Sequence, residues 1–260
     1  MTRQQMLVAA ATVAIAALPV TGIAAPYHYT STPLVASSNS AALNYNVTAD
    51  GKTFSLSNAV PAAGSVTTTM TAPYAVTSSK ATFSNNAVSG NFALNTTAAT
   101  VVDKATSPTH TLTSISATSS SSIKSFSSVL SYSGISLISI SGTKLVSHAK
   151  STLTSKGVAT STGTPVSFGG LSVTASSYLG LTFNPLGFPA AGVPVAANYI
   201  LAHNANNTLI IYLNHQFTTG TSPHFTSIKV DAIDVYIAPG FSLLGHTAYG
   251  DIEIGTSYAD

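Results

Sequence analysis

LNYNVTADGKTFSL, residues 43–56, is the stretch that decides the fold. Its first five residues alternate apolar and polar side chains, as a strand with one buried face requires. Asp50 and Gly51 come next, and this dipeptide accepts the positive φ angles of a type I′ turn. Alternation then resumes through Phe54 and Leu56. The stretch therefore predicts a β-hairpin with one face against a core.

Similar short runs, separated by Gly, Asn, Ser and Pro, continue to the C-terminus. Residues 26–260 contain no sustained helical periodicity with caps. Many short strands with frequent turns predict an all-β, antiparallel β-sandwich or jelly roll. A β-solenoid, the alternative, needs a fixed repeat length, and we find none. The expected strands include residues 66–71, 88–94, 109–117, 135–140, 209–217, 226–237 and 251–254.

Two of these runs change the parity of their apolar positions. In residues 135–140 and again in residues 226–237, the apolar side chains move from odd to even numbers or the reverse. Such a shift predicts a β-bulge, because one extra residue keeps both halves facing the core. In residues 209–217 no shift is expected. One face of that strand is predicted to carry Leu209, Ile211, Leu213, His215 and Phe217.

Two further segments have unusual composition. Residues 114–133 are rich in Ser, which would suit a linker, but apolar residues recur within them. We therefore favour strands with Ser on the solvent face over a disordered segment. Residues 184–197 hold three Pro and two Gly and are expected to form a loop.

The N-terminus has the three parts of a secretory signal. Arg3 is followed by an apolar run over residues 6–18 and then by small residues up to Ala25. The run is shorter than the roughly 20 residues that span a bilayer. We expect residues 1–25 to be cleaved and prefer this to an uncleaved anchor. Residues 26–40 are expected to be a flexible or pairing arm, and residues 41–260 a β-sandwich domain or two sub-domains divided near residues 120–133.

The overall composition narrows the classes of function. Only 6% of the residues are charged, the formal net charge is +2, and there is no Cys. An ordinary domain is about 25% charged. No disulfide framework or thiolate metal site can form, and nucleic acid is not an expected partner. We predict an exported chain that stays dissolved through hydroxyl and amide groups, with no membrane span in its mature form.

From about residue 134 to residue 260, the order of features resembles the choice-of-anchor P family of bacterial exported proteins. This resemblance implies secretion and an all-β domain, and it implies no catalytic residues. It does not cover residues 26–133. The similar pieces are Gly134 to Leu137, Lys144 to Ser155, Ser177 to Phe183, Gly192 to Val195, Leu209 to Gln216, Ile228 to Ile237 and Gly250 to Asp260.

A metal centre would have to come from the C-terminal half, where imidazole and carboxylate groups could hold Zn²⁺ tetrahedrally. No two of these residues have a diagnostic spacing. We therefore favour hydrogen-bonded histidines scattered over strands and loops, and we assign no metal, cofactor or catalytic residue. The candidates considered are His203, His215, His224, His246, Asp231, Asp234, Asp251 and Glu253.

Hydrolytic sites are also weakly supported. There is no Gly-x-Ser-x-Gly elbow, and the two Ser-x-x-Lys matches, at residues 121–124 and 147–150, are expected by chance in a Ser-rich chain. Paired carboxylates for glycoside hydrolysis must face each other. Asp251 and Glu253 share a strand face, and Asp231 and Asp234 could approach them, but we favour solvated charges.

Tyrosine is the one functional residue type in good supply, with 11 copies. Its ring could stack on a sugar or a partner. We expect a secreted, non-enzymatic structural or adhesive protein of the cell surface or exterior, whose partner is itself or extracellular polysaccharide. The alternatives are a carbohydrate-binding module and, less favoured, a secreted hydrolase. The candidate stacking residues are Tyr27, Tyr29, Tyr178, Tyr199 and Tyr212.

Overall fold

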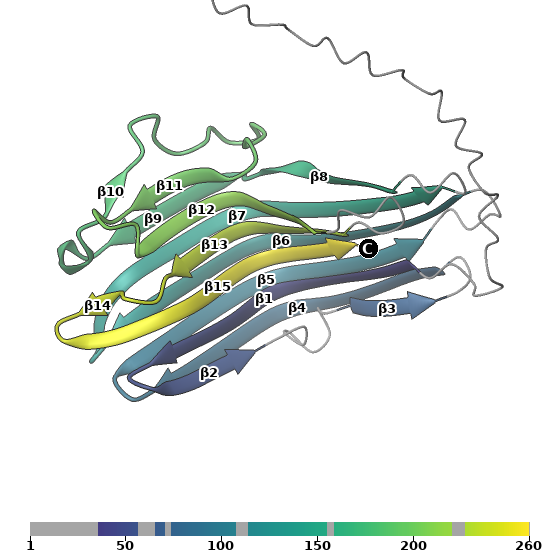
Figure 1. Ribbon diagram of the computed structural model, residues 1–260. Coiled ribbons are helices and arrows are strands. Elements are labelled where there is room, and N and C mark those ends of the chain that lie inside the picture. Colours follow the sequence, from purple (N-terminus) through teal and green to yellow (C-terminus); the bar gives the residue numbers. More distant parts are fainter. Residues whose placement is uncertain are drawn as a thin grey trace, which may run out of the picture. The chain divides into compact units, whose positions relative to one another are not determined.

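The computed structural model describes residues 36–56, 66–70, 74–107, 114–154, 159–219 and 227–259. Nearly all of them lie in antiparallel strands that form two sheets (Figure 1), which confirms the all-β, sandwich-like fold. They belong to one compact unit, Leu34–Asp260. The expected signal, residues 1–25, lies outside the described residues. Within those ranges, no helix has the length and apolarity that a bilayer crossing requires.

Sheet A is formed by nine strands of the described residues, and sheet B by six. In sheet A the order is β10 (Thr182–Phe183), β11 (Tyr199–His203), β12 (Leu209–Thr219), β13 (Ser227–Ile237), β15 (His246–Ala259), β1 (Ala36–Ala49) and β2 (Lys52–Leu56), with β14 (Ser242–Leu243) on β15 and β3 (Val66–Met70) on β1. In sheet B the order is β4 (Tyr74–Ser89), β5 (Phe92–Ser107), β6 (Ser114–Tyr132), β7 (Ile135–Thr154) and β8 (Ala159–Ser167), with β9 (Gly170–Ala175) on β7. A 3-10 helix, η1 (Ser177–Leu179), follows β9.

The predicted hairpin over residues 43–56 is confirmed. β1 pairs with β2, and the turn residues Asp50 and Gly51 have φ angles of 50° and 74°. β1 begins earlier than expected, because residues 36–40 also pair with β15 and β3. The last part of the expected arm is therefore strand, and residues 26–35 lie outside the described residues.

The strand predicted over residues 88–94 and the loop predicted over residues 184–197 have different outcomes. A single strand over residues 88–94 is wrong, because Gly90, with φ of 59°, and Asn91 form the turn between β4 and β5. This dipeptide favours a tight turn more strongly than the flanking apolar residues favour a continuous strand. The loop over residues 184–197 is confirmed, since it joins β10 to β11.

The β-bulge predicted within residues 135–140 is confirmed. Leu130 pairs with Ile138, but Ser131 pairs with Ser136, so Leu137 is the extra residue. Both Leu137 and Ile138 are buried. The extra residue thus lets Leu137 face the core together with Ile138 and Ile140, whereas Ile135, at the start of the strand, is 48% exposed.

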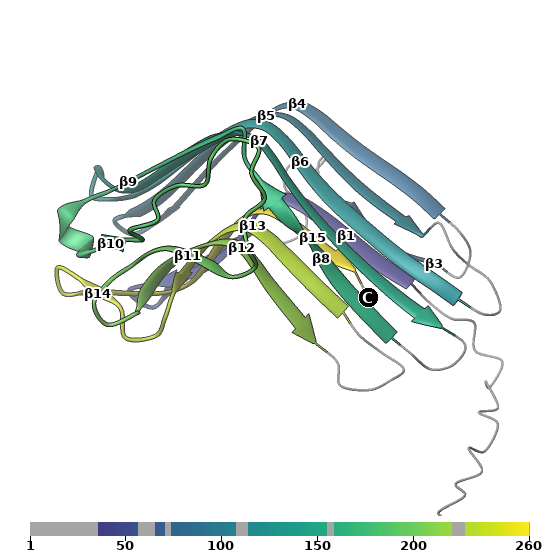
Figure 2. The ribbon, with the colours of Figure 1, turned by 90° about the horizontal axis from the view of Figure 1, so that it is seen from above.

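In each sheet, one row of residues that runs across four neighbouring strands lacks backbone pairing, and we call this row the crease. The register on its two sides is the same, so no strand gains a residue there. Every second strand has a positive φ at the crease, between 50° and 68°. Figure 2 shows both sheets bent along this line, with sheet A on the inner side of the bend. The unpaired rows are Ala81, Thr100, Lys124 and Lys144 in sheet B, and Ala42, Gly255, Ala232 and Asn214 in sheet A.

The crease reverses which residues of a strand face the core. In β5 the buried positions are even-numbered from Phe92 to Ala98 and odd-numbered from Val101 to Ser107. The parity shift within residues 226–237 has this cause and is not a one-residue bulge. In β12, Leu213 is fully buried and Asn214 has φ of 52°. The prediction that His215 and Phe217 share the face of Leu209 is therefore wrong, because both follow the crease.

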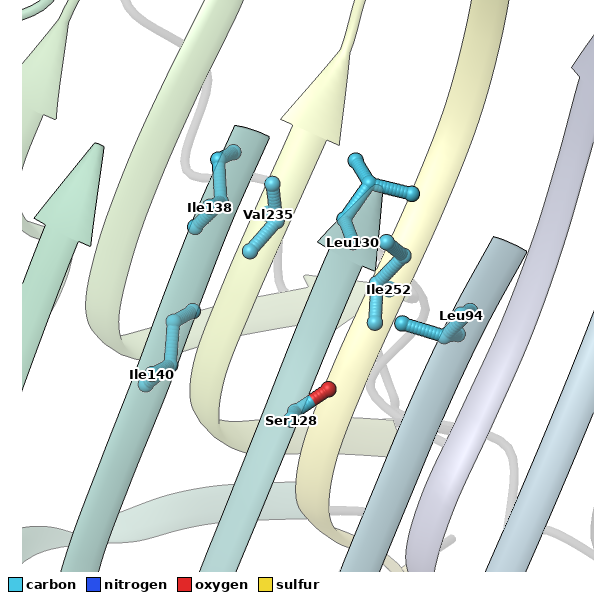
Figure 3. A pocket seen from close by; sticks show the side chains of 7 residues that line it. All are labelled: Leu94, Ser128, Leu130, Ile138, Ile140, Val235 and Ile252. Carbon is cyan, nitrogen blue, oxygen red and sulfur yellow. The ribbon is translucent and has the colours of Figure 1, made fainter. Parts of the chain in front are cut away.

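On one side of the crease the interior is apolar. A small pocket between the sheets has one hydroxyl group among six aliphatic side chains (Figure 3). That hydroxyl, of Ser128, hydrogen-bonds Thr96 at 2.8 Å. A water molecule needs two to four polar partners, so the lining of this pocket does not suit an ordered water. Its lining residues are Leu94, Ser128, Leu130, Ile138, Ile140, Val235 and Ile252.

On the other side the interior is rich in hydroxyl groups. The expectation that β6 keeps its Ser residues in solvent is wrong, because several of them are buried against sheet A. Small side chains let the two sheets approach closely enough to hydrogen-bond each other: the hydroxyls of Ser147 in β7 and Ser257 in β15 are 2.7 Å apart. The buried serines of β6 on this side are Ser116, Ser119 and Ser121.

Candidate functional site

The candidate site lies on the face of sheet A that is turned away from sheet B, at the crease. We call it the crease cluster: His215 of β12, Lys229, Asp231 and Asp234 of β13, and Glu253 of β15. Asp231 and Asp234 would point to opposite faces of a regular strand, but the crease lies between them. Both carboxyl groups are therefore on the inner side of the bend, where each is almost fully buried. The fold thus gathers charge at its sharpest bend.

Hydrogen bonds and ion pairs join the members of the cluster. His215 Nδ1 lies 2.6 Å from Asp234 Oδ2, and Lys229 Nζ lies 3.0 Å from Asp231 Oδ2. Lys229 also hydrogen-bonds Glu253. The Thr256 hydroxyl donates to Asp231 Oδ1 at 2.8 Å. The cluster thus spans three neighbouring strands, and β15 supplies both Glu253 and Thr256.

Aromatic rings fix the orientation of His215. The Tyr212 ring stacks on the imidazole with centroids 4.1 Å apart and planes 14° from parallel. Phe217 packs on it at 4.0 Å and also lies under Lys229 Nζ at 5.4 Å. Because Phe217 is 43% exposed, part of this ring surface is open to solvent. The imidazole is held in place before any ligand arrives.

The carboxyl groups have unusual proton affinities. Burial, with the repulsion of Asp251 and Glu253, raises the pKa of Asp234 to about 8. Burial and the Glu253 charge raise the pKa of Asp231 despite the attraction of Lys229. Burial lowers the pKa of His215. His215 and Asp234 therefore share one proton near neutral pH, and the imidazole is a poor cation.

Lys229 is the positive centre of the cluster. Burial lowers the pKa of its ammonium, but the neighbouring Asp231 and Glu253 carboxylates outweigh burial and hold the pKa above its ordinary value. Lys229 therefore stays charged. The four acids of this region (Asp231, Asp234, Asp251 and Glu253) are more than half of the seven in the whole chain. In a chain with 6% charged residues, this is an uncommon concentration.

The structure brings some of the metal-ligand candidates together and separates others. One ligand atom each from His215, Asp231 and Asp234 lies within 4.8 Å of the other two. Among the described histidines, His203 bonds the Asn204 carbonyl oxygen and His246 pairs with Asp50. His224 lies outside the described residues. His215 is also hydrogen-bonded, to Asp234, but the crease places it among the acids of β13.

The remaining candidates lie elsewhere. Ser121 and Ser147 of the two Ser-x-x-Lys matches face the interior, whereas Lys124 and Lys150 are exposed. Neither match can therefore form a Ser–Lys pair. Tyr212 is part of the site. Tyr199 donates its hydroxyl to the Gly187 carbonyl oxygen, Tyr178 is exposed on η1, and Tyr27 and Tyr29 lie outside the described residues.

Sequence reasoning missed Lys229 and Thr256 as members of the site. It also missed Asn44, whose amide donates to Glu253 at 3.5 Å. A usable signal was present: the parity shift in residues 226–237 places Asp231 and Asp234 on one face only if the strand is creased. A crease forms only if neighbouring strands bend at the same row of residues, and the sequence of a single strand does not show this.

Comparison with known proteins gives no family for the chain. No protein-family model matches it, and no curated protein or solved structure matches it either. The resemblance of residues 134–260 to the choice-of-anchor P family stays a prediction.

Proposed function

We propose that the chain is an exported, non-enzymatic protein of the cell surface or exterior that adheres to extracellular polysaccharide through the outer face of sheet A. The observation that carries this proposal is the ring surface of Tyr212, His215 and Phe217 beside hydrogen-bonding side chains. Proteins commonly bind sugars in this way: an aromatic ring packs against the C–H face of the sugar, and polar side chains hydrogen-bond its hydroxyl groups. The signal-like residues 1–25 support export.

Further polar groups lie on the same face in β15 and β1, the second and third strands from the rings of β12. Glu253 is half-buried and hydrogen-bonded to Asn44, and Asn46 is exposed two residues further along β1. Asp251, also half-buried, is paired in register with Asn46. This face therefore offers amide donors and carboxylate acceptors at the strand spacing. A neutral, hydroxyl-rich glycan fits it better than a highly charged one.

A glycan array with the full chain tests this proposal. We expect binding to one class of polysaccharide, weakened at least tenfold by Tyr212→Ala. The matched control is Tyr178→Ala, because Tyr178 is 60% exposed but lies on η1 and away from the face. An array without signal, or an equal loss in both variants, would rule out glycan binding on this face.

Self-association is a second candidate, and the edge of sheet B favours it. β4 is a 16-residue strand that pairs only with β5 among the described strands, and Lys80 is its single charged residue. Long edge strands with few charges are templates for pairing with another chain. Copies of this protein could join there.

Light scattering during size exclusion measures this association directly. We expect assemblies at high concentration that Ser79→Lys with Ala81→Lys removes, since both residues are exposed on the edge strand. Asn95→Lys, exposed on the interior strand β5, is the control and should keep the assemblies. A monomer at every concentration would refute edge pairing.

The hydrolase alternative is tested by turnover of polysaccharide substrates. If the carboxyl groups of β15 were catalytic, Asp251→Asn and Glu253→Gln would abolish the turnover. We expect no turnover in any of the three proteins. Release of reducing sugar by the unsubstituted chain alone would replace the adhesive proposal with an enzymatic one.

A further inference from the structure

We infer that His215, Asp231 and Asp234 form a binding site for one divalent transition-metal ion of the zinc type, held by an imidazole nitrogen and two carboxylate oxygens. This goes beyond the proposed function, because the ion can bind with no glycan present. The site is built by the crease, which turns three residues of two strands toward one point.

The distances suit such an ion. Ligand atoms at about 2.0–2.2 Å from a tetrahedral metal lie roughly 3.3 Å from one another. The three groups already lie within 4.8 Å. Closing the remaining gap needs only small side-chain rotations. The stacked ring of Tyr212 and the tilted ring of Phe217 already orient the His215 imidazole.

Two buried oxygens lack any hydrogen-bond partner. Asp231 Oδ2 and Asp234 Oδ1 are both shielded from solvent without one. Lys229 Nζ forms an ion pair with Asp231 Oδ2 at 3.0 Å, so the oxygen left with neither a hydrogen bond nor an ion pair is Asp234 Oδ1. Buried charged groups are normally paired or bound to a metal. Asp234 Oδ1 is therefore the buried oxygen that is available to a metal ion.

The charges also leave room for a divalent cation. Four carboxylates, of Asp231, Asp234, Asp251 and Glu253, face one ammonium, of Lys229, and the imidazole of His215. Acidic groups therefore outnumber basic groups around the site. The Thr256 hydroxyl holds Asp231 from behind through Oδ1, as supporting residues do around metal ligands.

The ligand set selects the kind of metal. Imidazole with carboxylates suits Zn²⁺ and similar ions, whereas Ca²⁺ takes only oxygen ligands and six to eight of them. On binding, the ion replaces the proton that His215 Nδ1 and Asp234 Oδ2 share, and this proton is released to solvent. A water molecule would complete the coordination.

Calorimetric titration of the chelator-treated full chain with Zn²⁺ tests the site. We expect one equivalent to bind, and Asp234→Asn and His215→Gln each to weaken binding at least tenfold. His203→Gln is the control, since His203 lies on the neighbouring strand β11 and bonds only a backbone oxygen. Circular dichroism of each variant verifies that the sheets are retained.

Binding of Co²⁺ is a second measurement. We expect visible absorption typical of a tetrahedral site with nitrogen and oxygen ligands, and we expect Asp234→Asn to remove this absorption. The inference is overturned if the unsubstituted chain binds no stoichiometric Zn²⁺, if His203→Gln and Asp234→Asn bind it equally, or if Ca²⁺ binds more tightly than Zn²⁺. If Asp234→Asn does not fold, His215→Gln decides alone. A blank glycan array would leave all these results unchanged.

Discussion

Ser147 and Ser257 join the two sheets through hydroxyl groups 2.7 Å apart in the interior of the sandwich. Ser257 Oγ also accepts a hydrogen bond from the backbone N–H of Ser121 at 3.1 Å. All three residues are fully buried. A core usually holds its layers together with apolar packing, but on this side of the crease side-chain hydrogen bonds between the sheets contribute as well.

Replacement of Ser257 by Ala should therefore lower the free energy of unfolding by about 1–3 kcal/mol, because it leaves a buried donor without an acceptor. Ser147→Ala should cost less, since Ser257 would still accept from Ser121. Urea denaturation of both variants measures the difference. Ser172→Ala, exposed on β9, should change the stability by less than about 0.5 kcal/mol. Equal costs for Ser257 and Ser172 would show that the hydroxyl bridge does not stabilise the fold.

Thr96 and Ser128 form a second buried hydroxyl pair, here within sheet B. Ser128→Ala should cost about 1–3 kcal/mol because the Thr96 hydroxyl then has no partner. Adding Thr96→Val should recover most of that loss, since both polar groups are then gone and the shape is kept. Thermal unfolding of the single and double variants distinguishes this result from simple loss of packing, in which the double variant would be the less stable one.

Gly255 is the crease residue of β15, and its replacement by Ala should be costly for two reasons. Its φ of 68° is unfavourable for a residue with a Cβ, and a Cβ there would lie 2.4 Å from Leu145 Cδ2. Together these effects should cost about 2–4 kcal/mol. Gly187→Ala is a matched control: its φ is 72°, but no atom lies within 4 Å of the added Cβ. It should cost only the backbone part, about 1–2 kcal/mol. Equal effects of the two substitutions in chemical denaturation would mean that the crease is not tightly packed.

The crease marks the limit of what single strands could predict. Alternation over residues 43–56 and the Asp50–Gly51 turn were enough for the hairpin and the fold class, because both depend on local geometry. The face of His215 was not predictable in this way. Asn214 has a positive φ in the same row where pairing is interrupted in β13 and β15, and the sequence of one strand does not show which residues of other strands lie beside it. The same nonlocal bend assembles the crease cluster.

The Ser-rich composition of β6 gave a wrong prediction for the side chains that face sheet A. Ser-rich residues 114–133 suggested a solvent face, because hydroxyl groups are usually hydrated. Here Ser119, Ser121 and their neighbours are small enough to let sheet A approach. The burial of Asp103 in the same layer could not be foreseen from its surroundings in the sequence, where it lies between Val102 and Lys104.

Asp103 gives the last prediction, on pH. Its carboxyl is fully buried and neither oxygen has a hydrogen-bond partner. Burial raises its pKa to about 7, and the nearby Ser121 hydroxyl opposes this only in part. The folded protein therefore keeps a proton that the unfolded chain, with a pKa near 3.8, releases. Between about pH 4 and pH 7 the folded state binds more protons, so the free energy of unfolding falls as the pH rises through this range and levels off above it.

Three pKa units correspond to at most about 4 kcal/mol. The Asp103→Asn variant keeps the shape without an ionisable group, so it should lack this part of the fall and be more stable than the parent at pH 8. Urea denaturation at intervals from pH 4.5 to pH 8 measures the difference between the two curves, which removes the contributions of all other groups. Ser172→Ala, which is exposed and removes no ionisable group, should follow the parent curve between pH 5 and pH 8. If the Asp103→Asn curve ran parallel to the parent, the Asp103 carboxyl would have to be ionised inside the sandwich and compensated by water between the sheets.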